Sequence, residues 1–204
     1  MVGEQPLSFI FPRFSLSSDA MRKLTHSEIA QKRIKPDEIP DARRIPVAVI
    51  VDNVRSLYNI GSIFRTSDGA MVAKLILTGF TPYPPRKEIE KTALGSTKSV
   101  PWQYMENPRE AIALMKEQGY KICCLELTDS SISYDQIQLI DFPVCVVIGN
   151  EVGGISREII AQSDIAIEIP MFGTKQSLNV AVAYGIAVFE LARIWRNNHP
   201  PGRT

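Results

Sequence analysis

Glu151 is the acidic side chain of this sequence that is best placed to hold a ligand. It follows the apolar run 144–148 and precedes the pair Gly153-Gly154. An isolated carboxylate in a loop is usually solvated, but glycine lets the backbone turn and approach a bound group closely, so we expect Glu151 to lie in a site. The alternative is a tight turn in which Ser156 caps the next helix, and both interpretations can hold together.

Ser177 and Asn179 stand at the start of a long helix expected over 178–196. Free N–H groups and side-chain oxygens at a helix N-terminus can hold a polar ligand. Ordinary capping explains these two residues equally well when they are considered alone. Comparable loops at 149–156 and 170–173 favour a ligand site, because all three place a polar run beside an apolar one.

Arg65 lies in an upstream segment, 59–70, whose apolar spacing predicts a helix with Asn59 as its N-cap. Gly61 and Arg65 are four residues apart and therefore share one face of that helix. A buried or half-buried arginine there would suit a phosphate group, because its planar guanidinium presents several donors. The alternative is a surface arginine in a salt bridge.

Several common kinds of site are not expected. No strand is followed by the glycine pattern of a dinucleotide-binding loop, and no P-loop lysine pattern occurs. His26 and His199 lie in terminal segments, so neither a zinc centre nor a Ser-His-Asp triad is expected. Cys123, Cys124 and Cys145 lie in strand-like runs without metal-ligand spacing, which predicts buried, reduced thiols.

Alternating strands and helices must position these groups. We expect strands at 47–51, 74–79, 102–105, 121–127, 144–149 and 165–171, and helices at 59–70, 87–94, 107–118 and 178–196, with a short helix opened by Ser156. This alternation predicts an α/β fold with a mostly parallel sheet and helices on both faces. Ligands of such sheets bind beyond the carboxyl ends of the strands.

Residues 1–46 are interpreted as an N-terminal extension and residues 47–204 as one α/β domain. Helical spacing over 16–35 is followed by a proline-containing linker. The basic residues of the extension indicate either a solvated helix face or an arm that contacts RNA, and they are Arg22, Lys23, Lys32, Arg33, Lys35, Arg43 and Arg44. Beside the site, Arg86, Lys87, Lys91 and Lys98 could add phosphate contacts.

The bulk properties limit the partners. The net charge is +1, so nucleic-acid binding would need a local basic patch or patches pooled in an oligomer. No apolar run approaches the roughly 18–20 residues that span a bilayer, and the first residues lack the order of a signal peptide. We therefore expect a cytoplasmic protein with no membrane partner.

Three segments together resemble the motifs of the SpoU (TrmH) family of RNA ribose methyltransferases, within the SPOUT superfamily. They occur in the family's order, and they are Asn59-x-Gly61-x-x-x-Arg65-Thr66, Gly149-Asn150-Glu151-x-Gly153-Gly154-Ile155-Ser156, and Ile169-Pro170-Met171-x-Gly173-x-x-x-Ser177-Leu178-Asn179-Val180-Ala181-Val182-Ala183. The resemblance extends from about Val47 to Trp195. The segment 87–95 is also similar to the family's substrate-side loop.

The resemblance implies an α/β domain whose C-terminal part is threaded into a trefoil knot, an exception to the general rule against threading. It implies an S-adenosylmethionine pocket that uses Gly149, Ile169 and Leu178, largely through backbone groups, with Met171, Ser177 and Asn179 nearby. It also implies a homodimer with an active site drawn from both subunits.

The implied reaction is methylation of a ribose 2′-hydroxyl in structured RNA, with transfer RNA ahead of ribosomal RNA. Arg65 would be the central catalytic residue, and Asn59, Glu151 and Asn179 would shape the site. Two alternatives are a knotted RNA-binding protein without catalysis and a doubly wound enzyme that uses another nucleotide. The four polar residues argue against the first alternative, and the missing phosphate loops argue against the second.

Overall fold

The computed structural model describes residues 21–35, 37–39 and 42–199, and contacts divide the chain into units 1–35 and 36–204. The first unit contains α1 (His26–Gln31). Thr25 and Glu28 cap its start, since each side chain accepts the backbone N–H of the other residue. The helix predicted over 16–35 is wrong in extent, because α1 buries no side chain that could stabilise further turns. Residues 16–20 lie outside the described residues.

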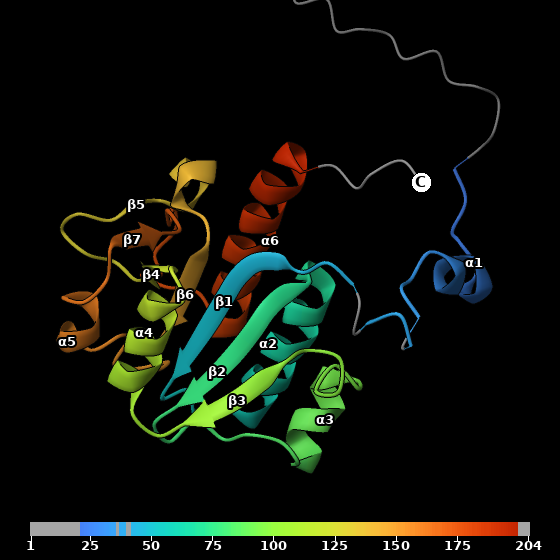
Figure 1. Cartoon of the computed structure of the whole chain (residues 1–204), viewed down its shortest axis with the longest axis horizontal. Coiled ribbons are helices and arrows are strands. Elements are labelled where there is room, and N and C mark those ends of the chain that lie inside the picture. The colour runs from blue at the N-terminus through green and yellow to red at the C-terminus, as the bar shows by residue number, and fades with distance from the viewer. Residues whose placement is uncertain (1–20, 36, 40–41, 200–204) are drawn as a thin grey trace, which may run out of the picture. The chain divides into compact units, whose positions relative to one another are not determined.

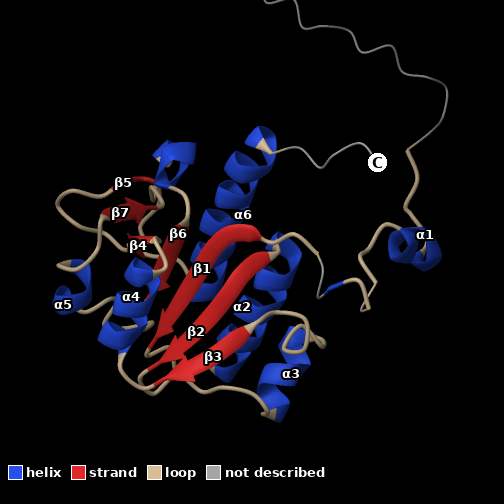
Figure 2. Ribbon diagram, in the orientation of Figure 1, coloured by secondary structure: helices blue, strands red, loops and turns tan. Residues whose placement is uncertain are grey.

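The second unit is a seven-stranded parallel sheet (Figures 1 and 2), in the order β3-β2-β1-β6-β4-β7-β5. The strands are β1 (Ile45–Asp52), β2 (Val72–Thr78), β3 (Trp102–Met105), β4 (Lys121–Leu125), β5 (Ile132–Ser133), β6 (Val144–Ile148) and β7 (Ile165–Glu168). The helices are α2 (Leu57–Ala70), α3 (Lys87–Ala93), α4 (Pro108–Glu117), α5 (Arg157–Ile160) and α6 (Val180–Asn198). Short 3₁₀ turns cover Tyr134–Gln136 and Leu139–Asp141.

Side chains of β1 alternate between two cores. Val47, Val49 and Val51 pack into the core that includes α2 and α6. Ala48 and Ile50 pack into the core that includes α4 and α5. A central strand buried on both faces requires a continuous apolar run of β-branched type, as this segment has. The predicted α/β fold with helices on both faces is therefore confirmed.

Register brings the carboxyl ends of the central strands to one edge of the sheet. Val51, near the end of β1, lies opposite Leu77 of β2 on one side and Ile148 of β6 on the other. In Figure 1 the arrowheads of β1, β2 and β3 end together. Loops that follow these strands must therefore meet, although they are far apart in the sequence.

Element boundaries differ from the predictions at the site. The N-cap of α2 is Ser56, whose side chain accepts the N–H of Asn59, so the prediction that Asn59 caps this helix is wrong. The helix begins one turn earlier because Ser56 already supplies the capping oxygen. At the other end of the unit, β7 stops at Glu168 instead of residue 171, and α6 begins at Val180 with Asn179 as its N-cap.

Cys123, Cys124 and Cys145 are buried and free, as predicted. Burial raises the pKa of the Cys123 and Cys145 thiols above the ordinary value, so both stay protonated at neutral pH. They serve the core as small apolar groups.

Candidate active site

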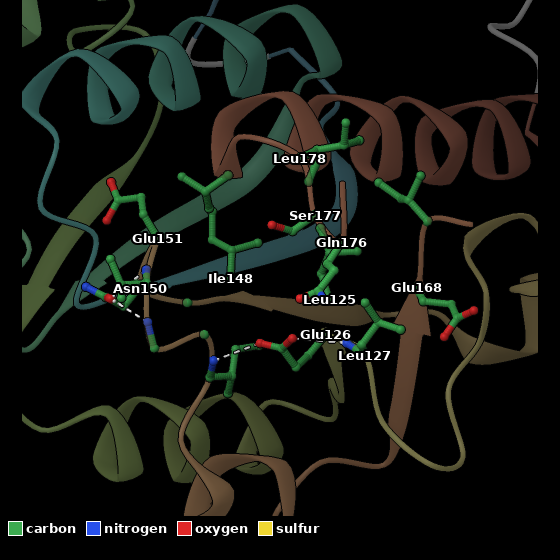
Figure 3. Close-up of a pocket in the computed structure, with 18 of the residues that line it drawn as sticks. Leu125, Glu126, Leu127, Ile148, Asn150, Glu151, Glu168, Gln176, Ser177 and Leu178 are labelled. Carbon is green, nitrogen blue, oxygen red and sulfur yellow. Dashed lines mark hydrogen bonds between the residues drawn. The ribbon is translucent and has the colours of Figure 1, made fainter. Parts of the chain in front are cut away.

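A cavity of about 550 Å³ lies beyond the carboxyl ends of β4, β6 and β7 (Figure 3). Loops that follow these strands form its wall, together with the segment that leads into α6. All five residues predicted to bind the cofactor lie on this wall, namely Gly149, Ile169, Met171, Ser177 and Leu178. The structure thus brings together positions that are as far apart in the chain as Leu125 and Ala183.

Asn150 organises the loop after β6. Its Oδ1 accepts two N–H groups from further along the loop, at 2.9 Å each, and its Nδ2 donates to the Asn53 carbonyl at 2.8 Å. A Cβ added at Gly149 would lie 2.5 Å from the Gly154 carbonyl carbon, so only glycine allows the loop to close on itself. The loop is therefore held in shape without a ligand.

Glu126 is a wall residue that sequence reasoning missed. It directly follows β4, and its Oε2 accepts the Ile155 N–H at 2.9 Å (Figure 3). Glu168, at the end of β7, also lines the cavity. The sequence signal that could have identified both residues is their position, because each carboxylate lies at the carboxyl end of a strand in a parallel sheet.

Three predicted polar residues are joined by hydrogen bonds. Asn59 Nδ2 donates to Glu151 Oε1 at 3.0 Å, and Asn179 Nδ2 donates to Asn59 Oδ1 at 3.2 Å. Glu151 also accepts the N–H groups of Arg55 and Ser56, at 3.1 and 3.2 Å, just before α2. We call Asn59, Glu151 and Asn179 the polar triad. It connects the start of α2 with the start of α6.

Hydrogen bonds keep the Glu151 carboxylate ionised. Partial burial alone would raise its pKa, but donors from the backbone of Arg55, its own backbone, the Asn59 amide and the backbone of Ser56 together outweigh burial and lower the pKa. Glu151 is consequently an orienting acceptor at neutral pH. A carboxylate with a lowered pKa is a poor proton acceptor.

Arg65 is exposed, which agrees with the alternative of a surface arginine and not with that of a buried or half-buried one. Ile63, Phe64 and Ser67 take the buried side of α2, which leaves Arg65 on the solvent side. Among residues 21–35, 37–39 and 42–199 its side chain has no hydrogen-bond or ion-pair partner, while its backbone belongs to α2. Its guanidinium is therefore free to meet an external anion, but the structure does not bring it into hydrogen-bond contact with the polar triad.

Arg44 of the predicted basic arm has a structural role. Its guanidinium donates to the Val72 and Ser99 carbonyls at 3.1 and 2.6 Å, and burial lowers its pKa. Arg22 is paired with Glu28. These two cations are therefore engaged within the protein.

Residues 46–189 match the model of the SpoU rRNA Methylase family. The chain belongs to this family. It is 34% identical over 167 residues to the tRNA (guanosine(18)-2'-O)-methyltransferase of Aquifex aeolicus, and the match covers 81% of this chain and 78% of the relative. It is 31% identical to the 23S rRNA (guanosine-2'-O-)-methyltransferase RlmB of Vibrio parahaemolyticus, covering 77% of this chain and 63% of the relative.

Solved structures show the same SpoU-family fold. The A. aeolicus TrmH/SpoU tRNA modifying enzyme superposes with a TM-score of 0.70 at 32% identity, covering 79% of this chain and 81% of that one. The AdoMet-bound rRNA methyltransferase from Sinorhizobium meliloti also gives 0.70, at 30% identity, covering 83% of this chain and 62% of that one.

The wall residues fit S-adenosylmethionine, the cofactor of SpoU-family enzymes. Leu125, Leu127 and Leu178 offer apolar surface for a flat base, and the carboxylates of Glu126 and Glu168 suit hydroxyl or cationic groups. The cavity volume of about 550 Å³ lies within the range of small-molecule sites.

Proposed function

We propose that this protein methylates the 2′-hydroxyl of a ribose in transfer RNA, with S-adenosylmethionine as methyl donor. The observation that carries the proposal is the polar triad, of which Glu151 and Asn179 line a cavity that fits the cofactor, in a chain of the SpoU family. The A. aeolicus relative named for tRNA guanosine 18 favours tRNA. The Vibrio relative named for 23S rRNA makes ribosomal RNA the second candidate. The proposed location is the cytoplasm.

Gly149, Ile169 and Leu178 are proposed to hold the cofactor through backbone groups, with Met171 and Ser177 beside them. Bound S-adenosylmethionine supplies a methyl group already activated by a cationic sulfonium. The protein must then align the ribose oxygen with that group and let the hydroxyl proton leave. The preformed loop 149–155 supports this proposal, because a rigid wall fixes the position of the cofactor.

Asn59, Glu151 and Asn179 are proposed to orient the ribose, and Arg65 is proposed to bind the neighbouring phosphate and to stabilise the emerging alkoxide. A guanidinium presents N–H donors and no acceptor, so Arg65 is not assigned the role of proton acceptor. A phosphate oxygen or water takes the proton. Exposure of Arg65 on α2 supports this role, because an RNA phosphate can reach it from solvent.

A homodimer and a trefoil knot are part of the same proposal. On α6, Val182 and Phe189 share one face, and each is 52% exposed, which suits burial by a second copy. The chain between β7 and α6 lines one cavity with the loops after β4 and β6, as threading would require. Within the described residues, no helix combines the length and apolarity that a membrane span needs.

The test is methyl incorporation from labelled S-adenosylmethionine into separate tRNA and rRNA pools, taken from cells that lack this protein. We expect label in tRNA ribose with the wild-type chain and none with Arg65→Ala, while cofactor affinity stays nearly unchanged. Arg109→Ala on α4 is the matched control, because its exposed ion pair with Glu158 contributes little.

Each other result has a definite meaning. Label in rRNA alone would identify ribosomal RNA, the second candidate, as the substrate. Tight RNA binding without methyl incorporation into either pool would favour the alternative, a knotted RNA-binding protein without catalysis. Equal loss of turnover and cofactor binding in Arg65→Ala would contradict the division of labour between Arg65 and the cofactor wall.

A further inference from the structure

A second cavity, of about 510 Å³, lies beyond the carboxyl ends of β2 and β3. We call it the aromatic cavity. Its lining consists of Arg55, Leu57, Gly79, Phe80, Thr81, Pro82, Tyr83, Arg86 and Tyr104. Among these described residues are three aromatic side chains, two arginines and no carboxylate. The cofactor wall and the polar triad use none of these side chains.

The aromatic side chains of this cavity stand in solvent. Phe80, Tyr83 and Tyr104 are 58%, 45% and 37% exposed. The rings of Tyr83 and Tyr104 lie 4.7 Å apart at an interplanar angle of 39°, and the Arg55 guanidinium lies 5.3 Å from the centre of the Phe80 ring. Exposed rings beside a cation make a surface on which another flat group can stack.

The loop that carries Phe80 is firmly anchored. Thr81 is buried, and its hydroxyl donates to the Val51 carbonyl at 3.0 Å and accepts the Val54 N–H at 3.2 Å. The Phe80 N–H donates to Asn53 Oδ1 at 3.1 Å. A rigid backbone thus holds Phe80 outward. A ligand that stacks on Phe80 therefore loses little binding free energy to the ordering of this loop.

Arg55 connects the aromatic cavity with the polar triad. Its N–H donates to Glu151, while its guanidinium lies over the Phe80 ring. The loop after β1 therefore forms a shared border between the two sites. An RNA strand that reaches the polar triad along this edge of the sheet would next pass over Phe80.

We propose that the aromatic cavity binds an unpaired nucleobase of the substrate RNA, adjacent to the methylated nucleotide. The inference rests on the proposed function and adds that the substrate is recognised through a single-stranded base. The base stacks on Phe80 and Tyr83, and Arg55 and Arg86 bind its flanking phosphates. Proteins read unpaired RNA by this combination of aromatic stacking and cationic contacts. Two arginines without an acidic lining residue favour RNA over a peptide.

Phe80 variants of the full chain test the proposal with an unmodified tRNA transcript as probe. We expect the Kd for the transcript to rise about tenfold in Phe80→Ala and in Phe80→Leu, because leucine keeps apolar volume but offers no ring face. Phe80→Trp should restore binding. Cofactor affinity should not change in any variant. Ile140→Ala removes an equally apolar side chain, 78% exposed, and is the control.

Abasic substitution of the transcript, one nucleotide at a time, identifies the base. At one unpaired position the wild type and Phe80→Leu should bind equally weakly, because the stacking partner is gone. Equal Kd values for wild type and Phe80→Leu on the intact transcript would overturn the inference. So would a difference that persists at every abasic position, because Phe80 would then not act through a single base. Methyl incorporation is measured separately. A protein that binds the base through Phe80 but does not methylate the RNA would therefore contradict only the proposed function.

Discussion

A single carboxylate sets the direction of both amides in the polar triad. Glu151 only accepts hydrogen bonds, so Asn59 must turn its Nδ2 toward it and its Oδ1 toward Asn179. Asn179 must then present its own Nδ2, which leaves its Oδ1 to accept the Ala181 N–H at the start of α6. One chain of hydrogen bonds therefore runs between two helix starts. The orientation of both amides therefore depends on the ionisation of Glu151.

Glu151→Gln should lower turnover at least tenfold and lower the free energy of unfolding at pH 7 by at most about 1 kcal/mol, since the side chain is exposed. The folded state lowers the pKa of Glu151, so its contribution to stability is complete above the ordinary pKa of about 4.3. That contribution is lost as the pH falls through the folded-state pKa. Urea unfolding of both proteins between pH 7 and pH 3 measures the difference.

Glu117→Gln on α4 is the control for this prediction, because it removes an exposed carboxylate outside the triad. Its stability difference from wild type should stay small and flat across the same pH range. A difference between wild type and Glu151→Gln that grows toward low pH would contradict the assigned direction of the pKa.

At the scale of elements, Asn179 performs two tasks that a pair of substitutions can separate. It caps α6 through Oδ1 and binds Asn59 through Nδ2. Asn179→Ala should cost about 1 kcal/mol of stability and also lower turnover. Asn179→Asp should keep the cap and the stability but lower turnover, because a carboxylate cannot donate to Asn59. Thermal unfolding and methyl transfer measure the two effects, and equal stability loss in both variants would refute the separation.

Contact between α2 and α3 depends on Gly61. A Cβ there would lie 2.0 Å from Thr92 Oγ1 and 2.3 Å from the Ile89 carbonyl oxygen, so the helices must move apart. Gly61→Ala should therefore lower the free energy of unfolding by about 2 kcal/mol and displace Asn59 from Glu151. In the same helix, an added Cβ at Gly69 meets only Phe189, at 3.5 Å. Gly69→Ala should be neutral or stabilise by up to about 1 kcal/mol. Denaturant titration distinguishes these outcomes.

At the scale of the whole molecule, the apolar face of α6 predicts the assembly state. Phe189→Asp places a charge in the centre of the proposed dimer interface and should produce a monomer, because an unpaired buried charge is costly. Sedimentation velocity across a protein concentration series measures the assembly. Ile140→Asp, at another exposed apolar position, should leave the dimer intact. A wild-type chain that stays monomeric at all concentrations would remove the dimer from the proposed function.

Much of the fold could be predicted from the sequence because its signals are local. The apolar runs of β1 and β6, and the helical spacing before Ala70, come from residues close together in the chain. The same holds for α3 and α4, which agree with the predictions within about two residues. The start of α2 was misplaced because both Ser56 and Asn59 are good capping residues, and only the packed helix shows which one caps it.

The polar residues of the site could be predicted from their position beside glycines and strand ends. The contacts between them could not be predicted in this way. Asn59 and Glu151 are 92 residues apart, and no local pattern encodes the hydrogen bond between them. The solvent side of Arg65 follows from which face of α2 the core covers. The engagement of Arg44 and the wall position of Glu126 depend instead on which distant segments lie beside the start of β1 and the end of β4. By itself, then, the sequence determined six of the seven strands, the five helices of the second unit and the family motifs, because short-range periodicity and chemistry specify them, whereas the two-residue strand β5 has no such pattern. Only the tertiary structure decided which loops meet and which polar atoms pair, because strand order and register bring distant segments to one edge of the sheet.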